Sequence, residues 1–268
     1  MIDFHSHILY GIDDGSSDIE ESIEIIKKMR TLGFDKIILT PHYIEDSKYS
    51  ANNKIKNELK NNLDNQNLGI ELYVANEIFI NEDIDKLVYK QEISTINNTS
   101  YVLVELPFEE ELPELDDILD DLLQENFKVI IAHPERYVYF RNNRNRVVEL
   151  SNQGIYFQCN YESIIGKYGA DAQNMVKYMF HANLVSFLGS DIHRKNSAFF
   201  NNFNTIKKEI IKIIGEDKFN KITNENPNKV LKNSILPIPE YNSPTKSNFL
   251  KGIINKLGHG SELWIKKK

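Results

Sequence analysis

Two histidines one residue apart stand near the start of the chain, directly after a short apolar run. His5 and His7 would lie on the same side of an extended segment, because side chains i and i+2 of a strand share a face. Imidazole nitrogens are common ligands of divalent metal ions. The pair therefore indicates the start of a metal centre, provided that other parts of the chain supply further imidazoles and carboxylates.

Further histidines and acids recur in one kind of place, at or just after the end of an apolar run. They are His42, Glu77, Glu105, His133, Asp191 and His193. Taken singly, each has an ordinary structural explanation: the two histidines beside prolines could be hydrogen-bonded in turns, and the glutamates could pair with lysines. Independent coincidences at the same end of six segments are a poor explanation, so a shared site is the better interpretation.

The elements that would position these residues are alternating strands and helices. Seven apolar segments predict strands, namely the N-terminal run and residues 36–40, 71–75, 101–107, 128–132, 155–159 and 184–188. Helices are predicted from a Ser17–Glu20 capping box to Gly33, within 46–69, and over 115–122, 170–180 and 200–233. This order predicts a parallel α/β barrel with one strand fewer than the usual eight, in which all C-terminal strand ends open on one face.

Composition limits the class of protein and of chemistry. Of 268 residues, 41% are hydrophobic and 26% charged, and no run is long enough to span a membrane, so we expect a cytoplasmic protein. The single cysteine, Cys159, excludes disulfides within the chain and a thiolate zinc cluster, and we expect it in the core. A cysteine-based phosphatase is disfavoured, because Ile165 stands where such enzymes have their phosphate-binding arginine.

Charge divides the chain into a body, residues 1–240, and a C-terminal tail, residues 241–268. The tail carries six lysines and one acid, a net charge of +5, which leaves −12 for the body of a chain whose total is −7. So acidic a body is a poor binder of nucleic acid but suits divalent cations. The lysines and apolar residues of the tail suggest contact with an anionic membrane surface or an acidic partner, the alternative being a disordered solubilising end.

Seven motifs, in one order, resemble the PHP (polymerase and histidinol phosphatase) superfamily. They are His5-Ser6-His7, Gly11-Ile12-Asp13-Asp14-Gly15, Thr40-Pro41-His42, Asn76-Glu77-Ile78, Val104-Glu105-Leu106-Pro107, His133-Pro134-Glu135-Arg136 and Ser190-Asp191-Ile192-His193. From residue 1 to about residue 235, the sequence is most similar to the manganese-dependent bacterial protein-tyrosine phosphatases of the CpsB/YwqE type, which belong to capsule and exopolysaccharide gene clusters.

The resemblance implies a PHP-type phosphatase domain over residues 1–240, a distorted, TIM-like seven-stranded (β/α) barrel with three divalent metal ions. The three implied ligand sets are His5, His7, Glu77 and Asp191; Glu77, Glu105 and His133; and Asp14, His42 and His193, with Glu77 bridging the first two. A share for Asp13 is left open. Imidazoles with carboxylates suit manganese, iron or zinc, and manganese is the metal that the family implies.

The implied reaction is hydrolysis of phosphotyrosine on a protein by attack of a metal-bridging hydroxide, without a phospho-enzyme. The expected substrate is the tyrosine-rich tail of a membrane-bound tyrosine kinase that controls capsular or exopolysaccharide synthesis. Arg136 is the expected catalytic clamp of the phosphate oxygens, and its alternative role is a structural salt bridge. Arg194 lies near the place of the family's second arginine, so it either completes the phosphate site or faces solvent.

Two other functions stay open from the sequence alone. The same scaffold could hydrolyse a small phosphate ester, such as histidinol phosphate or a sugar phosphate, and phosphotyrosine peptides would then be poor substrates. It could also be a non-catalytic regulator that binds the kinase through a homo-oligomeric surface, with metals that serve only structure. The complete ligand set disfavours the regulator, because purely structural sites seldom need shared carboxylates around open positions.

Overall fold

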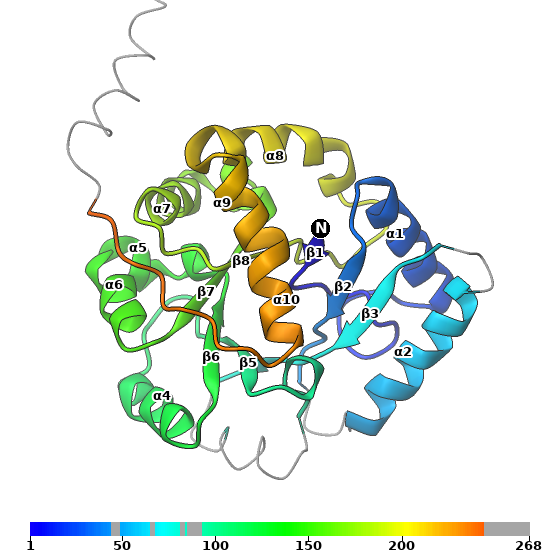
Figure 1. Cartoon of the computed structure of the whole chain (residues 1–268), viewed down its shortest axis with the longest axis horizontal. Helices are drawn as coiled ribbons and strands as arrows, with labels where there is room; N and C mark the ends of the chain where they lie inside the picture. Colours follow the sequence, from blue (N-terminus) through cyan, green and yellow to red (C-terminus); the bar gives the residue numbers. More distant parts are fainter. Residues whose placement is uncertain (44–48, 65–67, 81–83, 85–92, 244–268) are drawn as a thin grey trace, which may run out of the picture.

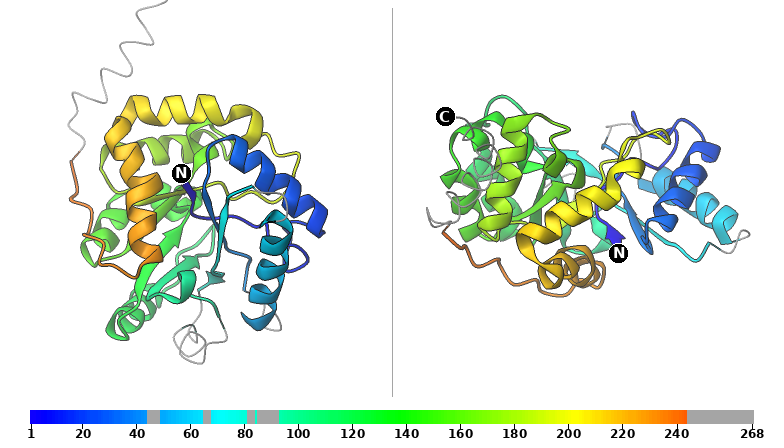
Figure 2. Two further views of the ribbon diagram at one scale, coloured as in Figure 1. Left: turned by 45° about the vertical axis from the view of Figure 1, so that its right-hand side comes forward. Right: turned by 90° about the horizontal axis from the view of Figure 1, so that it is seen from above.

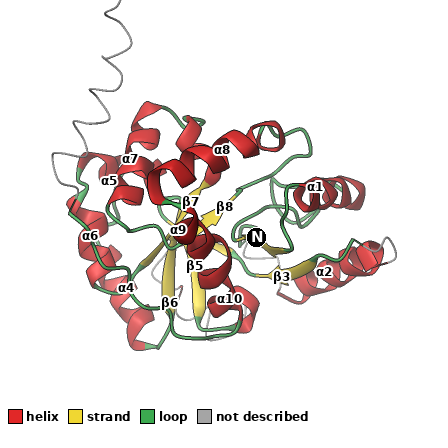
Figure 3. Ribbon diagram, turned by 45° about the horizontal axis from the view of Figure 1, so that its top comes forward, coloured by secondary structure: helices red, strands yellow, loops and turns green. Residues whose placement is uncertain are grey.

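The fold is described from a computed structural model, in which the described residues are 1–43, 49–64, 68–80, 84 and 93–243 (Figure 1). Strands lie at the centre and helices cover the outside (Figure 3). The strands are β1 (Ile2–Asp3), β2 (Lys36–Leu39), β3 (Glu71–Val74), β4 (Glu77–Phe79), β5 (Tyr101–Glu105), β6 (Lys128–Ala132), β7 (Tyr156–Asn160) and β8 (Phe187–Gly189). The helices are α1 (Ile19–Thr31), α2 (Tyr49–Asp64), α4 (Leu115–Gln124), α5 (Val138–Asn142), α6 (Asn145–Asn152), α7 (Ala170–His181), α8 (Phe199–Ile214), α9 (Glu216–Asn220) and α10 (Asn226–Leu231), with short helical segments η1 (Ile96–Asn98), η2 (Pro134–Arg136), η3 (Tyr161–Ile165) and η4 (Lys221–Glu225).

The described strands form two parallel sheets, of order β1-β2-β3 and β4-β5-β6-β7-β8. Helices α1 and α2 lie on the side of the first sheet and α4 to α7 on the side of the second (Figure 2). The parallel α/β architecture is therefore confirmed. A single seven-stranded barrel is not, because the described residues form eight strands in two sheets. The additional strand is β4, which lies beyond the predicted strand 71–75.

Asn76 marks the point where the chain passes from the first sheet to the second. Its side-chain Nδ2 donates a hydrogen bond to Pro41 O at 3.1 Å, and its Oδ1 accepts one from the Ser94 N–H at 2.9 Å. Directly after it, Glu77 begins a new pairing with Leu103 of β5. A polar residue that bonds to two other loops thus separates β3 from β4.

The other edges of the two sheets meet between β1 and β8. The Phe4 N–H donates to Leu188 O at 3.3 Å, and the Asp191 N–H donates to His5 O at 2.9 Å. Beyond the strands, Ser6 and Ile192 form an isolated parallel bridge. These contacts bring the segment after β8 beside the segment after β1, although about 185 residues separate them in the sequence.

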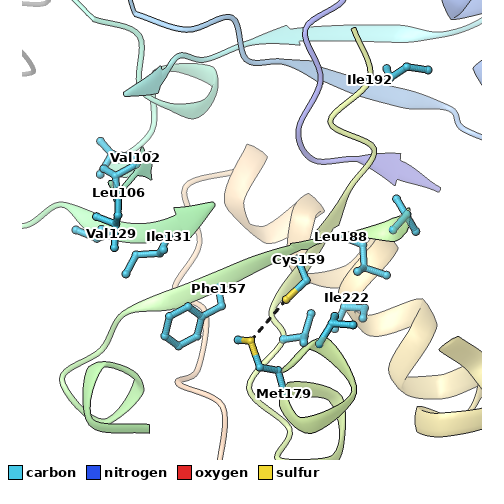
Figure 4. Close-up of a cluster of buried hydrophobic side chains, with 14 of the residues drawn as sticks. Val102, Leu106, Val129, Ile131, Phe157, Cys159, Met179, Leu188, Ile192 and Ile222 are labelled. Carbon is cyan, nitrogen blue, oxygen red and sulfur yellow. Dashed lines mark hydrogen bonds between the residues drawn. The ribbon is translucent and has the colours of Figure 1, made fainter. Parts of the chain in front are cut away.

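Side chains of the central strands alternate between two apolar clusters. In β5, Val102 and Val104 pack in an outer cluster with helix residues, whereas Tyr101 and Leu103 pack in an inner cluster between the sheets. The outer cluster includes Cys159, whose Sγ lies 3.9 Å from Met179 Sδ, so its predicted place in the core is confirmed (Figure 4). Glu105 continues the inner-facing series at period two, which directs its carboxylate inward at the C-terminal end of β5.

Helix α10 and the segment after it close the N-terminal end of the inner cluster. Val230 and Leu231 of α10 belong to this cluster. The Tyr101 hydroxyl at the start of β5 donates to Ser234 O at 2.8 Å, and the Leu236 N–H donates to the same hydroxyl at 3.1 Å. The predicted site therefore lies at the opposite end of the strands.

Helices α5 and α6 have no counterpart among the predicted helices, and two predicted helix boundaries differ for a local reason. Helix α1 is capped one residue later than predicted: Asp18 Oδ1 accepts from the Glu21 N–H at 2.8 Å, and Ser17 donates to the Glu21 carboxylate through its N–H and hydroxyl. The predicted helix 200–233 is divided, because Gly215 has φ +81° and ends α8.

The predicted basic tail lies almost wholly outside the described residues, which end at 243. Its boundary and its expected membrane contact stay predictions. Among the described helices, none combines the length and the apolar character needed to cross a bilayer.

Candidate metal centre

The predicted metal ligands come together because parallel strands end on one side of the molecule. Their places are His5, His7 and Asp14 after β1, His42 after β2, Glu77 at the start of β4, Glu105 at the end of β5, His133 after β6, and Asp191 and His193 after β8. The ligand atoms form three overlapping groups, and within each group they all lie within 4.8 Å of one another. The groups are His5/His7/Glu77, His42/Glu77/Glu105 and His7/Asp14/His42/His193. His133 contacts Glu77 and Glu105, and Asp191 contacts His5 and His7.

The first group surrounds one carboxylate oxygen. His5 Nε2 and His7 Nε2 lie 3.0 Å apart, and Glu77 Oε2 is 3.3 Å from the first and 3.2 Å from the second. Asp191 Oδ1 is 3.8 Å and 3.5 Å from the same two nitrogens. All four side chains are buried. The four residues that the sequence assigns to a first ion are therefore adjacent.

The second group includes a contact with the other oxygen of Glu77. His133 Nε2 is 2.9 Å from Glu77 Oε1 and 3.6 Å from Glu105 Oε1. His42 Nδ1 approaches the same pair of acids, at 3.2 Å from Glu77 Oε2 and 3.9 Å from Glu105 Oε2. Glu77 thus lies between two groups of nitrogens, as a bridging carboxylate must.

The third group is more exposed. Asp14 Oδ1 is 3.5 Å from His193 Nε2 and 3.9 Å from His42 Nε2. The ring of His7 stacks on that of His193, with centroids 4.1 Å apart. A ring nitrogen of His7 also belongs to this group. His42 therefore has one ring nitrogen toward each of two groups, and His7 contributes to two groups as well.

Hydrogen bonds fix which nitrogen of several imidazoles faces the cluster. His5 Nδ1 lies 2.7 Å from the amide oxygen of Gln158, and His193 Nδ1 lies 2.9 Å from the backbone oxygen of Asp191. An oxygen of this kind only accepts, so Nδ1 carries the proton and Nε2 presents a lone pair. Two atoms bound to one ion at about 2.1 Å would lie roughly 3.0–3.4 Å apart. The donor set and its spacing therefore fit divalent ions.

The same side chains carry strongly coupled charges. Burial opposes protonation of His7, but the carboxylates of Asp13, Glu77 and Asp191 outweigh it and raise the pKa of this imidazole well above its usual value. Burial likewise opposes ionisation of Glu77, and the imidazoles around it outweigh burial and hold its pKa well below the usual range. Burial and the neighbouring Glu77 raise the pKa of Glu105. Concentrated carboxylates of this kind require cations.

Asp13, whose share the sequence left open, holds the predicted ligand His7 in place. Its Oδ2 lies 2.6 Å from His7 Nδ1 and accepts from the His42 N–H at 2.9 Å, while Oδ1 accepts from the Gly15 N–H. Burial opposes ionisation, but these hydrogen bonds and the nearby imidazole lower the pKa of Asp13 to about 2. A carboxylate on the outer nitrogen of a ligand histidine fixes its ring and its tautomer.

Two polar residues of β7 also support the site, and the sequence prediction missed both. Gln158 accepts from His5 and donates through Nε2 to Asn160 Oδ1 at 3.0 Å. Asn160 Nδ2 in turn donates to Asp191 Oδ2 at 2.8 Å. A signal was present, because two amides at spacing i, i+2 share the inner face of the sixth predicted strand. Neither Gln158 nor Asn160 is charged or carries an imidazole, so neither fits the pattern of a metal ligand in the sequence.

The backbone of the site has special requirements. His133 and Asp191 have φ values of +33° and +51°, a region that L residues rarely adopt, and such strain concentrates at functional sites. Two glycines provide close approach. A Cβ on Gly15 would lie 2.0 Å from His7 O, and one on Gly189 would lie 2.5 Å from His5 Cβ.

A pocket of about 600 Å³ opens over the cluster. It is lined by Asp14, His42, Glu77, Glu105, Phe108, His133, Arg136, Lys167, Tyr168, Asp191 and His193. Arg136 Nη1 donates to Asp191 Oδ2 at 3.3 Å, so the arginine both forms the salt bridge considered from sequence and lines the pocket. Arg194 is half exposed, pairs with Glu21 at 3.5 Å and is not among the lining residues.

Residues 1–232 match the family model for capsular polysaccharide synthesis, CpsB/CapC. The chain belongs to the CpsB/CapC family. Among relatives in this family, the CapC protein of Staphylococcus aureus is 35% identical over 196 residues, which cover 72% of this chain and 77% of that protein. The tyrosine-protein phosphatase CpsB of Streptococcus agalactiae is 30% identical over 251 residues, or 87% of this chain and 99% of that protein.

A solved structure supports the same family. It comes from crystal structures of YwqE from Bacillus subtilis and CpsB from Streptococcus pneumoniae, described as unique metal-dependent tyrosine phosphatases. It superimposes with a TM-score of 0.82 at 26% sequence identity and covers 91% of this chain and 100% of that chain. The resemblance to the CpsB/YwqE type that the motifs indicated is confirmed.

Proposed function

We propose that this member of the CpsB/CapC family is a metal-dependent protein-tyrosine phosphatase that releases phosphate by direct attack of an activated water. The observation that carries the proposal is the convergence of imidazoles and carboxylates from six strand ends beside Arg136, in one open pocket. Relatives that are named tyrosine-protein phosphatases support the choice of phosphotyrosine over other phosphate esters.

The proposed cofactors are three divalent ions, manganese in preference to iron or zinc, held by the three ligand sets that the family resemblance implies. His7 is adjacent to the third set as well, and Asp13 orients it. When bound, the ions activate a water for attack and neutralise oxygens of the phosphate. His5 and His193 each make a hydrogen bond through Nδ1, and these bonds keep the Nε2 lone pair of each ring directed at the cluster.

Arg136 is the residue that we assign to the phosphoryl oxygens. One of its nitrogens bonds to Asp191, and its remaining N–H groups are available to a dianion in the pocket that it lines. Lys167 is a second cation of the lining, paired with Glu162. We leave Arg194 out of the proposed phosphate site, because it pairs with Glu21 instead.

The proposed protein substrate is the phosphotyrosine-bearing tail of a bacterial tyrosine kinase that acts in capsular or exopolysaccharide synthesis. The family description connects these proteins with capsular polysaccharide synthesis. The pocket also suits such a tail, since it is open to solvent and is lined by Phe108 and Tyr168 as well as by the basic side chains Arg136 and Lys167. An extended peptide could present a phosphotyrosine side chain there.

The test is a substrate panel with manganese-loaded protein. We expect a phosphotyrosine peptide to be hydrolysed with a much higher kcat/KM than a phosphoserine peptide or histidinol phosphate. Arg136→Ala should lower kcat/KM on the peptide by about 10²-fold or more. Arg144→Ala is the matched control, because Arg144 packs on Tyr178 away from the pocket. Faster hydrolysis of histidinol phosphate would favour the small-ester function, and no hydrolysis at all would favour the regulator.

A further inference from the structure

The guanidinium group of Arg136 lies over two aromatic rings. Its Cζ is 4.5 Å from the ring centroid of Phe108 and 4.7 Å from that of Tyr168. Phe108 follows β5, Arg136 follows β6, and Tyr168 follows η3. Three separate loops thus converge on one side chain at the wall of the pocket.

Each ring is itself fixed by other contacts of the site. Phe108 stacks on the His133 imidazole with centroids 5.7 Å apart and an interplanar angle of 17°, and it also contacts Tyr137 at 5.5 Å. The Tyr168 hydroxyl accepts from Asn160 Nδ2 at 3.2 Å and donates to Asp191 Oδ2 at 3.4 Å. Each ring is therefore anchored to a proposed metal ligand, Phe108 to His133 and Tyr168 to Asp191.

Among the described residues, the Arg136 side chain has one hydrogen-bond partner, Asp191, and that bond alone would not hold it in a single position. The side chain has several rotatable bonds, and the contact between Nη1 and Asp191 Oδ2 engages one of its nitrogens at a long 3.3 Å. Contact with two rings restricts the guanidinium further, because the positive group is attracted by both π systems.

We propose that Phe108 and Tyr168 are positioning residues that hold the Arg136 guanidinium at the pocket for its contact with the phosphoryl group. This inference rests on the proposed function, because it assigns the clamp to the arginine that binds phosphate there. In this role the two rings act through Arg136, so their loss should matter most when Arg136 is present.

The experiment is a double-mutant cycle in the full-length, manganese-loaded protein. The variants are Tyr168→Leu, Arg136→Ala and the combination of both. We expect Tyr168→Leu to lower kcat/KM on a phosphotyrosine peptide by about tenfold in the parent, and by less than about twofold in the Arg136→Ala background. Tyr168→Phe, which keeps the ring, should recover most of the loss. Equal losses in the two backgrounds would overturn the clamp.

Two further variants distinguish loss of the clamp from a general loss of folding stability. Phe108→Leu removes the other ring, and it should give the same background dependence even if Tyr168→Leu folds poorly. Tyr178→Leu removes a comparable contact, with Arg144 Cζ 5.0 Å from the ring, outside the pocket, and it should leave kcat/KM unchanged. A loss in Tyr178→Leu as large as in Tyr168→Leu would reduce the effect to general destabilisation and contradict the proposal.

Binding of inorganic phosphate, measured by calorimetry in the same cycle, separates this inference from the proposed function. Non-additive loss of phosphate affinity in a protein that hydrolyses no phosphotyrosine would support the clamp and refute the function. Additive losses in a protein that does hydrolyse phosphotyrosine would refute the clamp and leave the function standing.

Discussion

Alanine should not fit in place of Gly189, because an added Cβ would lie too close to the side chain of His5. A methyl group at this position would place Cβ 2.5 Å from His5 Cβ and 2.8 Å from Gln158 Nε2. Carbon atoms in contact lie about 3.5–4.0 Å apart, so His5 or β8 must move by about 1 Å. Overpacking of this kind costs about 1–3 kcal/mol of folding stability, and a displacement of about 1 Å at a catalytic group can cost about 10²-fold in rate.

The assay compares Gly189→Ala with Gly154→Ala for thermal unfolding and for hydrolysis of a phosphotyrosine peptide. Gly154 has φ +100° after α6 and no atom nearer than 3.8 Å to an added Cβ, so its substitution costs backbone strain alone. We expect the Tm of both variants to fall, by about 2–4 °C for each kcal/mol of lost folding stability. Activity should fall, by about 10²-fold, only in Gly189→Ala. Wild-type activity in Gly189→Ala would refute the steric argument.

Three other perturbations address the metal centre and the pocket. Removal of metal by a chelator should lower Tm by at least about 5–10 °C, since each ion at a hundred times its Kd contributes about 2.7 kcal/mol; an unchanged Tm in calorimetry would argue against folded-state metal sites. Asp13→Asn keeps the shape but removes the anionic acceptor of His7, and we expect metal affinity to fall about 10–100-fold by titration; an unaltered affinity would deny Asp13 its orienting role. Lys167→Met should raise KM for the peptide about fivefold, whereas Glu162→Gln, which breaks the same ion pair but keeps the cation, should not; equal effects of the two variants would reduce the lysine to a structural partner.

The ligand positions could be predicted from the sequence because they depend on few assumptions. An apolar run followed by His, Asp or Glu places that side chain at a strand end, and parallel strands bring such ends together regardless of the loops between them. Glu105 shows this most clearly, since its inward direction follows from the alternation of Tyr101 and Leu103 before it. The family resemblance then added the grouping of the ligands, which the contacts of Glu77 agree with.

The remaining features depend on tertiary structure that periodicity does not encode. The change of sheet at Asn76 depends on its hydrogen bonds to Pro41 and Ser94, which lie in other loops. The direction of Arg194 depends on the position of Glu21 in α1, about 170 residues earlier. The contact of Arg136 with Phe108 joins two loops in the same way. Local patterns could not show which residues meet across loops.

Metal-dependent hydrolysis of phosphotyrosine is the most direct test of the proposed chemistry. Metal-stripped protein is assayed with a phosphotyrosine peptide while manganese is added, beside His42→Ala, whose lost ring contributes to two of the three ligand groups. We expect no activity without metal, recovery as manganese is added, and little or no recovery in His42→Ala. Full activity in the stripped protein, or equal recovery in His42→Ala, would contradict a metal-dependent phosphatase built on these residues.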